Sequence, residues 1–183
     1  MARWAVITYG RAVDRAAEVR ELQARLKVRG LAVAGFAQEK SLDGEGRTSL
    51  ALVRLGRSDR AALGASGGGA SRADPERECS YSFDPGGFSL ARRWLEEDAA
   101  AARVLVLSEM SKLEAGGQGH HGALTWALSL PNDKVVVFAA RAEQLTYLVE
   151  KLAPPGEPVA WLELPSAEAE KDAFASALAA SIR

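Results

Sequence analysis

Two short runs of purely apolar residues limit the folds that this chain can adopt. Val104 to Leu107 and Val135 to Phe138 contain no polar side chain, so each strand that they predict must be covered on both faces. Strands of that kind occur in parallel sheets, whose crossover connections are usually helices. Segments with apolar residues three or four positions apart lie between the runs. The pattern therefore predicts an α/β fold of three layers, a mostly parallel sheet with helices on both faces.

The rest of the chain continues this alternation. Residues 5–8 and 159–164 are expected to be strands, and residues 31–55 are typical of a β-hairpin. Asp84 and Pro85 have the order of an N-cap followed by a first helical residue, and Ser89 is an alternative cap. The helices are predicted over 13–29, from 85 to about 102, and over 124–130, 144–152 and 166–182.

The sequence predicts one α/β domain over residues 1–183, which is long enough to bury one substantial core. Residues 56–78 interrupt the alternation with glycines among serine, alanine, arginine and aspartate. Such a segment buries little apolar surface and keeps its chain entropy. We therefore predict a flexible insertion at 56–78, within the domain and not at its boundary.

The charge balance and the cysteine count exclude several classes of function. Lysine and arginine number 23 and aspartate and glutamate 24, a formal net charge of −1, so neither a nucleic-acid partner nor a membrane surface is expected. No apolar run reaches the length of a membrane span, and the start of the chain lacks a signal-peptide layout. The single cysteine excludes an internal disulfide and a cysteine-rich zinc site. A cytoplasmic protein is expected; the cofactor and the oligomeric state stay open.

Ligands of parallel sheets bind beyond the carboxyl ends of the strands, which directs attention to the loops at 8–14, 38–40, 108–122 and 139–144. The first of these offers Tyr9, Gly10 and Arg11 as ligand-binding candidates. It contains neither GxxxxGK[ST] nor GxGxxG, so no phosphate loop is predicted. Arg11 and the free N–H groups of the following helix can attract an anion, or Arg11 is simply a solvated loop residue.

Residues 109–122 are interpreted as a polar, glycine-rich loop that follows a buried strand. Glu109 can position water or a metal ion or accept a proton, or it caps a helix or pairs with Lys112. The ligand-binding candidates of this loop are Glu109, Lys112, Glu114, Gln118 and His120.

The two histidines, His120 and His121, are adjacent, and adjacent side chains rarely point at one atom. No metal site is therefore assigned. Exposure, capping of the next helix, and binding of an anion or a partner all remain open for them. Cys79 has no histidine near it in the sequence and is not assigned as a nucleophile.

The stretch from Val104 to Glu114 resembles the nucleoside-triphosphatase family that includes the human cancer-related enzyme. In that family the apolar strand ends in Asp-Glu and continues as Ile-Gly-Lys-x-Glu. Glu109, Lys112 and Glu114 match this pattern, whereas Ser108 replaces the aspartate and Ser111 the glycine. Gly35-Phe36 also matches a Gly-Phe pair at the family's second strand.

A closer resemblance is to an uncharacterised bacterial family of unknown function, a derived branch of the same fold that is often found near molybdate-uptake genes. Its members lack the phosphate loop. They keep a cysteine before Asp-Pro, here Cys79 and Asp84-Pro85, and a Lys-x-Glu-Ala-x-Gly-x-Gly loop, here residues 112–119. The resemblance covers about residues 3–165 and implies a P-loop-NTPase-like fold with a degenerate nucleotide-binding site.

Two functions fit these residues. The first is a non-catalytic binding or regulatory module that binds a small anion, a nucleotide or a protein partner at the carboxyl edge of the sheet. The second is a divergent nucleotide phosphohydrolase with Glu109 as base and Lys112 as electrostatic stabiliser. The first is favoured, because the phosphate loop is missing and Ser108 replaces the aspartate that would orient magnesium.

Overall fold

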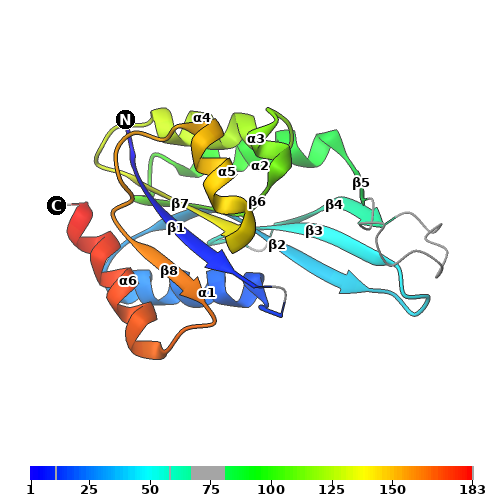
Figure 1. Cartoon of the computed structure of the whole chain (residues 1–183), viewed down its shortest axis with the longest axis horizontal. Coiled ribbons are helices and arrows are strands. Elements are labelled where there is room, and N and C mark those ends of the chain that lie inside the picture. Colours follow the sequence, from blue (N-terminus) through cyan, green and yellow to red (C-terminus); the bar gives the residue numbers. More distant parts are fainter. Residues whose placement is uncertain (11, 58, 67–80, 183) are drawn as a thin grey trace.

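The computed structural model describes residues 1–10, 12–57, 59–66 and 81–182. They form one eight-stranded sheet between two layers of helices, with the strand order β5-β4-β3-β2-β6-β7-β1-β8 (Figure 1). The strands are β1 (Arg3–Tyr9), β2 (Val33–Leu42), β3 (Thr48–Arg54), β4 (Arg60–Ser66), β5 (Tyr81–Phe83), β6 (Val104–Met110), β7 (Val135–Arg141) and β8 (Trp161–Leu164). The helices are α1 (Arg15–Val28), α2 (Pro85–Asp98), α3 (Lys112–Ala115), α4 (His121–Ser129), α5 (Ala142–Leu152) and α6 (Glu168–Ser181).

The two apolar runs are the central strands β6 and β7, as predicted. They pair in parallel, with Val104 opposite Val135 and Leu107 opposite Phe138. All eight residues of the two runs are at most 1% exposed, which explains why neither run contains a polar residue. β2, β6, β7, β1 and β8 run parallel, so the α/β fold with a mostly parallel sheet is confirmed.

Helices cover both faces of this parallel part. α1 and α6 lie on one face, where Leu26 and Phe174 pack against the odd-numbered residues of β7. α2, α4 and α5 lie on the other, where Leu95 and Leu148 pack against the even-numbered residues (Figure 1). Asp84 caps α2 through a hydrogen bond from the Gly86 N–H at 2.8 Å, and Pro85 follows it, as the sequence predicts. No helix within the described ranges is long and apolar enough to cross a membrane.

The antiparallel part of the sheet begins at β2. The predicted hairpin is β2 and β3, and β4 and β5 continue it. The flexible insertion predicted at 56–78 is therefore wrong for residues 60–66, which form β4. Leu63 is fully buried there, and a Cβ on Gly64 would lie 2.6 Å from the Ser82 carbonyl oxygen, so this glycine permits close strand contact. Residues 67–78 lie outside the described residues.

Gly35 lies in β2, the strand at which the parallel and antiparallel parts of the sheet meet. Gly35 of β2 has φ +121°, and a Cβ there would lie 1.9 Å from the carbonyl oxygen of Val106 in β6. The four residue pairs between β2 and β6 depend on this close approach.

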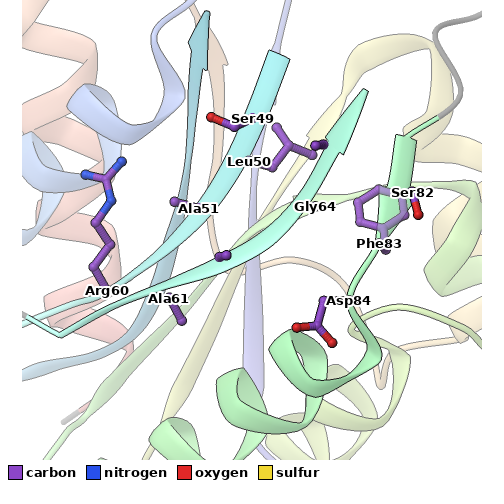
Figure 2. Close-up of a pocket in the computed structure, with 11 residues that line it drawn as sticks. Ser49, Leu50, Ala51, Arg60, Ala61, Gly64, Ser82, Phe83 and Asp84 are labelled. Carbon is purple, nitrogen blue, oxygen red and sulfur yellow. The ribbon is translucent and has the colours of Figure 1, made fainter. Parts of the chain in front are cut away.

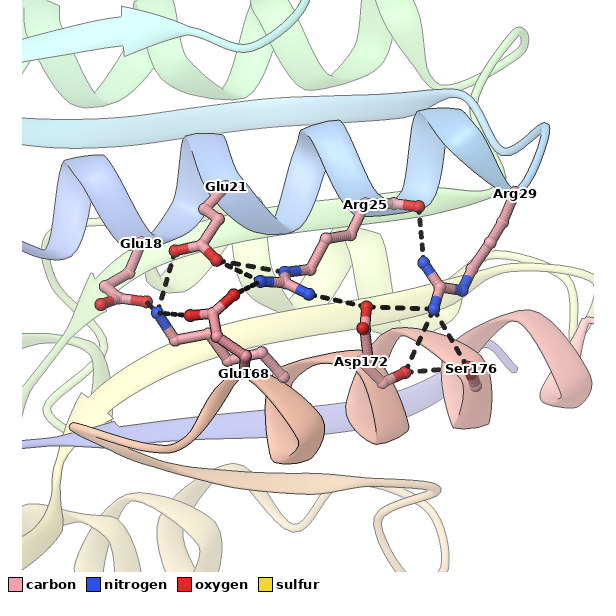
Figure 3. Close-up of polar contacts among 8 residues, drawn as sticks. Glu18, Glu21, Arg25, Arg29, Glu168, Asp172 and Ser176 are labelled. Carbon is pink, nitrogen blue, oxygen red and sulfur yellow. Dashed lines mark hydrogen bonds and ion pairs between the residues drawn. The ribbon is translucent and has the colours of Figure 1, made fainter.

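A network of charged side chains fastens α6 to α1 (Figure 3). Arg25 pairs with Glu21, Glu168 and Asp172, and Lys171 pairs with Glu18 and Glu21 at 2.9 Å each. Hydrogen bonds from Arg25 and then Lys171 lower the pKa of Glu21. Hydrogen bonds from Arg25 and Arg29 lower the pKa of Asp172. The network lies outside the apolar contact that Phe174 and Leu178 make with the core.

Candidate functional site

The carboxyl edge of the parallel strands contains an irregularity at Glu109. The pairing of β6 with β7 shifts between Leu107 and Met110, so Ser108 and Glu109 form a bulge. Glu109 has φ +66°, a left-handed conformation that disfavours any residue with a Cβ. Bulges and left-handed non-glycine residues concentrate at functional sites, and this one sets the direction of a carboxylate.

That carboxylate forms an ion pair with Arg15, from the first turn of α1. Both side chains are only 16% exposed. The Arg15 guanidinium also lies over the Tyr9 ring, 4.9 Å from its centroid. Burial raises the pKa of the Tyr9 hydroxyl to about 12, although the charges of Arg15 and then Arg141 oppose this shift. Tyr9, Arg15 and Glu109 thus connect β1, α1 and β6 across the end of β7.

The amino terminus of α1 carries its own acidic cap. Asp14 accepts a hydrogen bond from the Ala17 N–H at 3.1 Å, so a carboxylate occupies the place where a helix would otherwise attract an anion. Gly10 is exposed, and a Cβ there would meet no atom within 4 Å. Arg11, the third candidate of this loop, lies outside the described residues.

Ser108 is fully buried and its hydroxyl is used within the sheet. Its Oγ accepts a hydrogen bond from the Gln38 N–H at 2.8 Å. The paired part of β2 and β6 ends at Phe36 and Leu107, so the serine satisfies the next free N–H beyond the ladder. The hydroxyl oxygen of Ser108 therefore helps to hold β2 against β6.

The predicted loop at 109–122 is largely regular structure, and the interpretation as a loop is wrong there. β6 runs to Met110, Ser111 caps the short helix α3, and α4 begins at His121. The reason is a capping box, in which Ser111 and Glu114 satisfy each other's backbone N–H groups. The sequence contains this Ser-x-x-Glu signature at 111–114.

Glu114 lies inside this capping box, apart from Glu109. It is 1% exposed and accepts hydrogen bonds from the N–H of Ser111 at 2.7 Å, the hydroxyl of Ser111 at 2.9 Å and the N–H of His120 at 2.8 Å. Burial raises the pKa of its carboxyl, and these hydrogen bonds oppose the shift. The structure thus gives Glu114 a role in holding the turn together.

Lys112 and Gln118 are exposed on the same turn, so both are accessible from solvent at this edge. His120, in contrast, is buried between Phe36 and Phe88. The structure therefore brings together Tyr9 and Glu109, leaves Lys112 and Gln118 at the surface, and puts Glu114 and His120 inside.

Two arginines at this edge are absent from the sequence-based candidates. Arg15 follows Asp14 and belongs to the first helical turn, where its direction depends on the tertiary fold. Arg141 ends β7, and its side chain is 43% exposed. Its position after a fully apolar strand is the same signal that pointed to Glu109, so sequence reasoning had the means to find Arg141.

Within the described part of the chain, no three His, Cys, Asp or Glu residues cluster. A hollow of about 710 Å³ lies elsewhere, on the antiparallel part of the sheet (Figure 2). Its lining includes Ser49, Ala51, Gly64 and Ser82, and it shares no residue with the Tyr9–Arg15–Glu109 cluster.

The fold and this edge define the class of protein. The chain belongs to the family described as "Protein of unknown function (DUF2478)", whose model matches residues 4–145. No protein with a curated description matches the sequence.

Two solved structures share the fold. THEP1 from the hyperthermophile Aquifex aeolicus has a TM-score of 0.62 at 18% identity, over 94% of this chain and 95% of that one. A human cancer-related nucleoside triphosphatase has a TM-score of 0.65 at 22% identity, over 100% of this chain and 98% of that one. This chain therefore has the same α/β fold as these two proteins, which agrees with the fold that the resemblance of residues 104–114 implies.

Proposed function

We propose that this protein is a non-catalytic module that binds a small anion or the phosphate group of a nucleotide at the carboxyl edge of the sheet, with Arg15 as the principal cation. The Arg15–Glu109 ion pair carries the proposal. It unites the start of α1 with the end of β6, the two places that serve phosphate and magnesium in phosphoryl-transfer enzymes of this architecture. In this chain the positive charge of Arg15 at the first place and the negative charge of Glu109 at the second neutralise each other.

Three further observations support a binding role without hydrolysis. The loop at 8–14 contains neither GxxxxGK[ST] nor GxGxxG, and Asp14 puts a carboxylate at the start of α1. The hydroxyl of Ser108, which stands where the resembling family has an aspartate, is bonded to Gln38. An anion that enters must displace Glu109 from Arg15, so Glu109 acts as a competitor for the cation.

The alternative is a divergent phosphohydrolase that uses Glu109 as base and Lys112 as stabiliser. The exposure of Lys112, three residues after Glu109, favours it, since the ammonium is open to solvent at the end of β6. The two functions make opposite predictions for Glu109. Its removal strengthens binding if it competes for Arg15, and abolishes turnover if it is the base.

The test measures binding of pyrophosphate and ADP by calorimetry and hydrolysis of ATP with Mg²⁺ by phosphate release. We expect Glu109→Gln to bind pyrophosphate several-fold more tightly than the parent. We expect Arg15→Gln to bind it about tenfold more weakly, which corresponds to about 1.4 kcal/mol. No variant should release phosphate above the rate without protein.

The matched control is the Arg103–Asp133 ion pair, which joins the residues just before β6 and β7 at the opposite edge of the sheet. Arg103→Gln and Asp133→Asn change charge as the site variants do, but far from the site, and should leave binding unchanged. If the control and site variants changed binding equally, the change in affinity would come from the net charge of the protein and not from the site. Turnover that Glu109→Gln abolishes would establish the phosphohydrolase.

A further inference from the structure

A buried imidazole without a hydrogen-bond partner among the described residues lies between β2 and α2. His120 is 2% exposed, and neither ring nitrogen has a partner within the described residues. The ring lies 4.4 Å from the Phe36 ring of β2 and meets the Phe88 ring of α2 edge-on at 4.8 Å, centroid to centroid. Buried polar groups without a partner are rare and destabilising, so packing alone is a poor reason for a histidine here.

Hydrogen bonds to Glu114 fix the backbone around His120. The His120 N–H donates to Glu114 Oε1, while the other oxygen of that carboxylate accepts from Ser111. Gly119 has φ +60°, and a Cβ there would lie 2.3 Å from Glu114 Oε1. The turn at 111–121 is thus closed by a buried carboxylate at one end and a buried imidazole at the other.

Few charges face the imidazole from the elements around it. Glu114 of α3 contacts the backbone of His120 and is satisfied by other donors. On α2, the Arg92 guanidinium lies 3.4 Å from the place of a Cβ on Gly122. On α4, the His121 ring is bonded to the Glu114 carbonyl oxygen at 2.7 Å. β2 presents the apolar ring of Phe36, so no described acid is bonded to the His120 ring.

We propose that residues 111–121 form an acid-released latch. Neutral His120 keeps the turn closed, and protonation of the ring expels it from between Phe36 and Phe88. The turn that carries Lys112 and Gln118 then opens while the sheet stays folded. The latch concerns the chain without ligand, so it stands apart from the proposed anion binding and can succeed or fail by itself.

The direction of the pH effect follows from linkage. The apolar surroundings disfavour the protonated ring in the closed state, where burial lowers the pKa of His120 to about 3. In the open state the ring takes up its proton near its ordinary pKa of about 6.5. The ratio of open to closed turns therefore rises about tenfold for each pH unit below that value. The raised pKa of Glu114 acts in the opposite direction, because the closed state then holds that proton more tightly.

The experiment follows the turn and the ring in the same sample. Hydrogen exchange of the Ser111 and His120 amides, corrected for the intrinsic pH dependence of exchange, is measured from pH 7.5 to 4.5. The ring signals of the two histidines are followed by NMR, and His121→Gln identifies them. His120→Phe keeps an aromatic ring in the slot and leaves Glu114 in place. The difference between its profile and that of the parent therefore belongs to His120.

We expect the two amides of the parent to lose protection steeply below about pH 6, while amides of β6 and β7 stay protected. His120→Phe should lack this loss and His121→Gln should keep it. The latch is wrong if the His120 ring titrates near 6.5 with both amides still protected. It is also wrong if protection persists to pH 4.5, or disappears only with that of the central strands. If His120→Phe fails to fold, these outcomes are read from the parent alone.

Discussion

At the scale of single residues, Glu109 has an unusual backbone conformation. A glutamate with φ +66° stores backbone strain of about 1 to 2 kcal/mol, which a glycine would not have. The carboxylate it directs at Arg15 is therefore held in place against a local preference for another conformation. At such a position, a substitution that relieves the strain can stabilise the fold even though it removes the carboxylate from the site.

Two substitutions measure this strain. Glu109→Gly and Glu109→Ala both remove the ion pair with Arg15, so their comparison cancels it. Glu109→Gly should be the more stable by about 1 kcal/mol, because only alanine keeps a Cβ in the left-handed region. Urea unfolding monitored by circular dichroism gives the two free energies. A more stable alanine variant would mean that the bulge has a different conformation.

At the scale of elements, α6 is attached by an apolar contact and by a charged network. Phe174 is 3% exposed, and its ring lies in the core shared with α1. We expect Phe174→Ala to lower the free energy of unfolding by about 3 to 4 kcal/mol, since it leaves a cavity. Denaturant titration at low and high salt should give the same loss, because apolar burial is not screened.

The network should behave differently. Arg25→Gln removes a cation that pairs with three carboxylates, but these are exposed to solvent and screened. We expect a smaller loss than for Phe174→Ala, and one that shrinks further in 1 M NaCl. A loss that is unchanged by salt would show that Arg25 acts through the packing of its aliphatic stem.

The contact between β2 and β6 makes a third test at this scale. A methyl group on Gly35 collides with the Val106 carbonyl oxygen, so Gly35→Ala must push two paired strands apart. We expect a loss of about 3 kcal/mol or more. Gly46→Ala is the matched control, since Gly46 also has a positive φ but no atom within 4 Å, and it should cost about 1 kcal/mol. If Gly35→Ala and Gly46→Ala lowered the free energy of unfolding equally, backbone strain alone would explain the loss at Gly35, without a steric clash with Val106.

At the scale of the whole molecule, acid acts in two windows. Between about pH 6.5 and 3 the unfolded chain binds a proton at His120 that the closed form of the folded chain excludes, so the stability of the closed form falls as the pH falls. The Asp98 pKa is lowered by its hydrogen bonds from Arg54, both at 2.7 Å. Its contribution is present above the ordinary pKa of aspartate, about 3.9, and is lost as the pH falls below it.

Unfolding at pH 7.5, 5.5 and 3.5 distinguishes the windows. Asp98→Asn should be less stable than the parent by about 2 kcal/mol at pH 7.5, because Arg54 is 5% exposed and loses a charged partner. This difference should narrow by pH 3.5 and should be nearly unchanged between pH 7.5 and 5.5. A gap that stays constant to pH 3.5 would show that the Asp98 charge contributes nothing.

Most of the elements could be predicted from the sequence, because the apolar runs of β6 and β7 and the apolar spacing of α1 follow directly from the residues that these elements bury. Prediction from the sequence failed at β4, where alanines and a glycine in contact with a neighbouring strand look the same as a flexible segment. At the candidate site it proposed Tyr9 and Glu109 but not Arg15, since the partner of a charged side chain depends on distant strands. It also could not distinguish Glu114, held in a capping box, from a carboxylate that is free to bind.

The close approach at Gly35 also has a consequence for how related sequences vary. Selection for the scaffold alone forbids every side chain at this position, whatever the protein binds. Substitutions at Arg15 or Glu109, in contrast, are open to any lineage that changes its ligand. A glycine at the position of Gly35 should therefore persist in descendants that have lost or exchanged their chemistry. Its presence indicates this strand contact and not a shared activity.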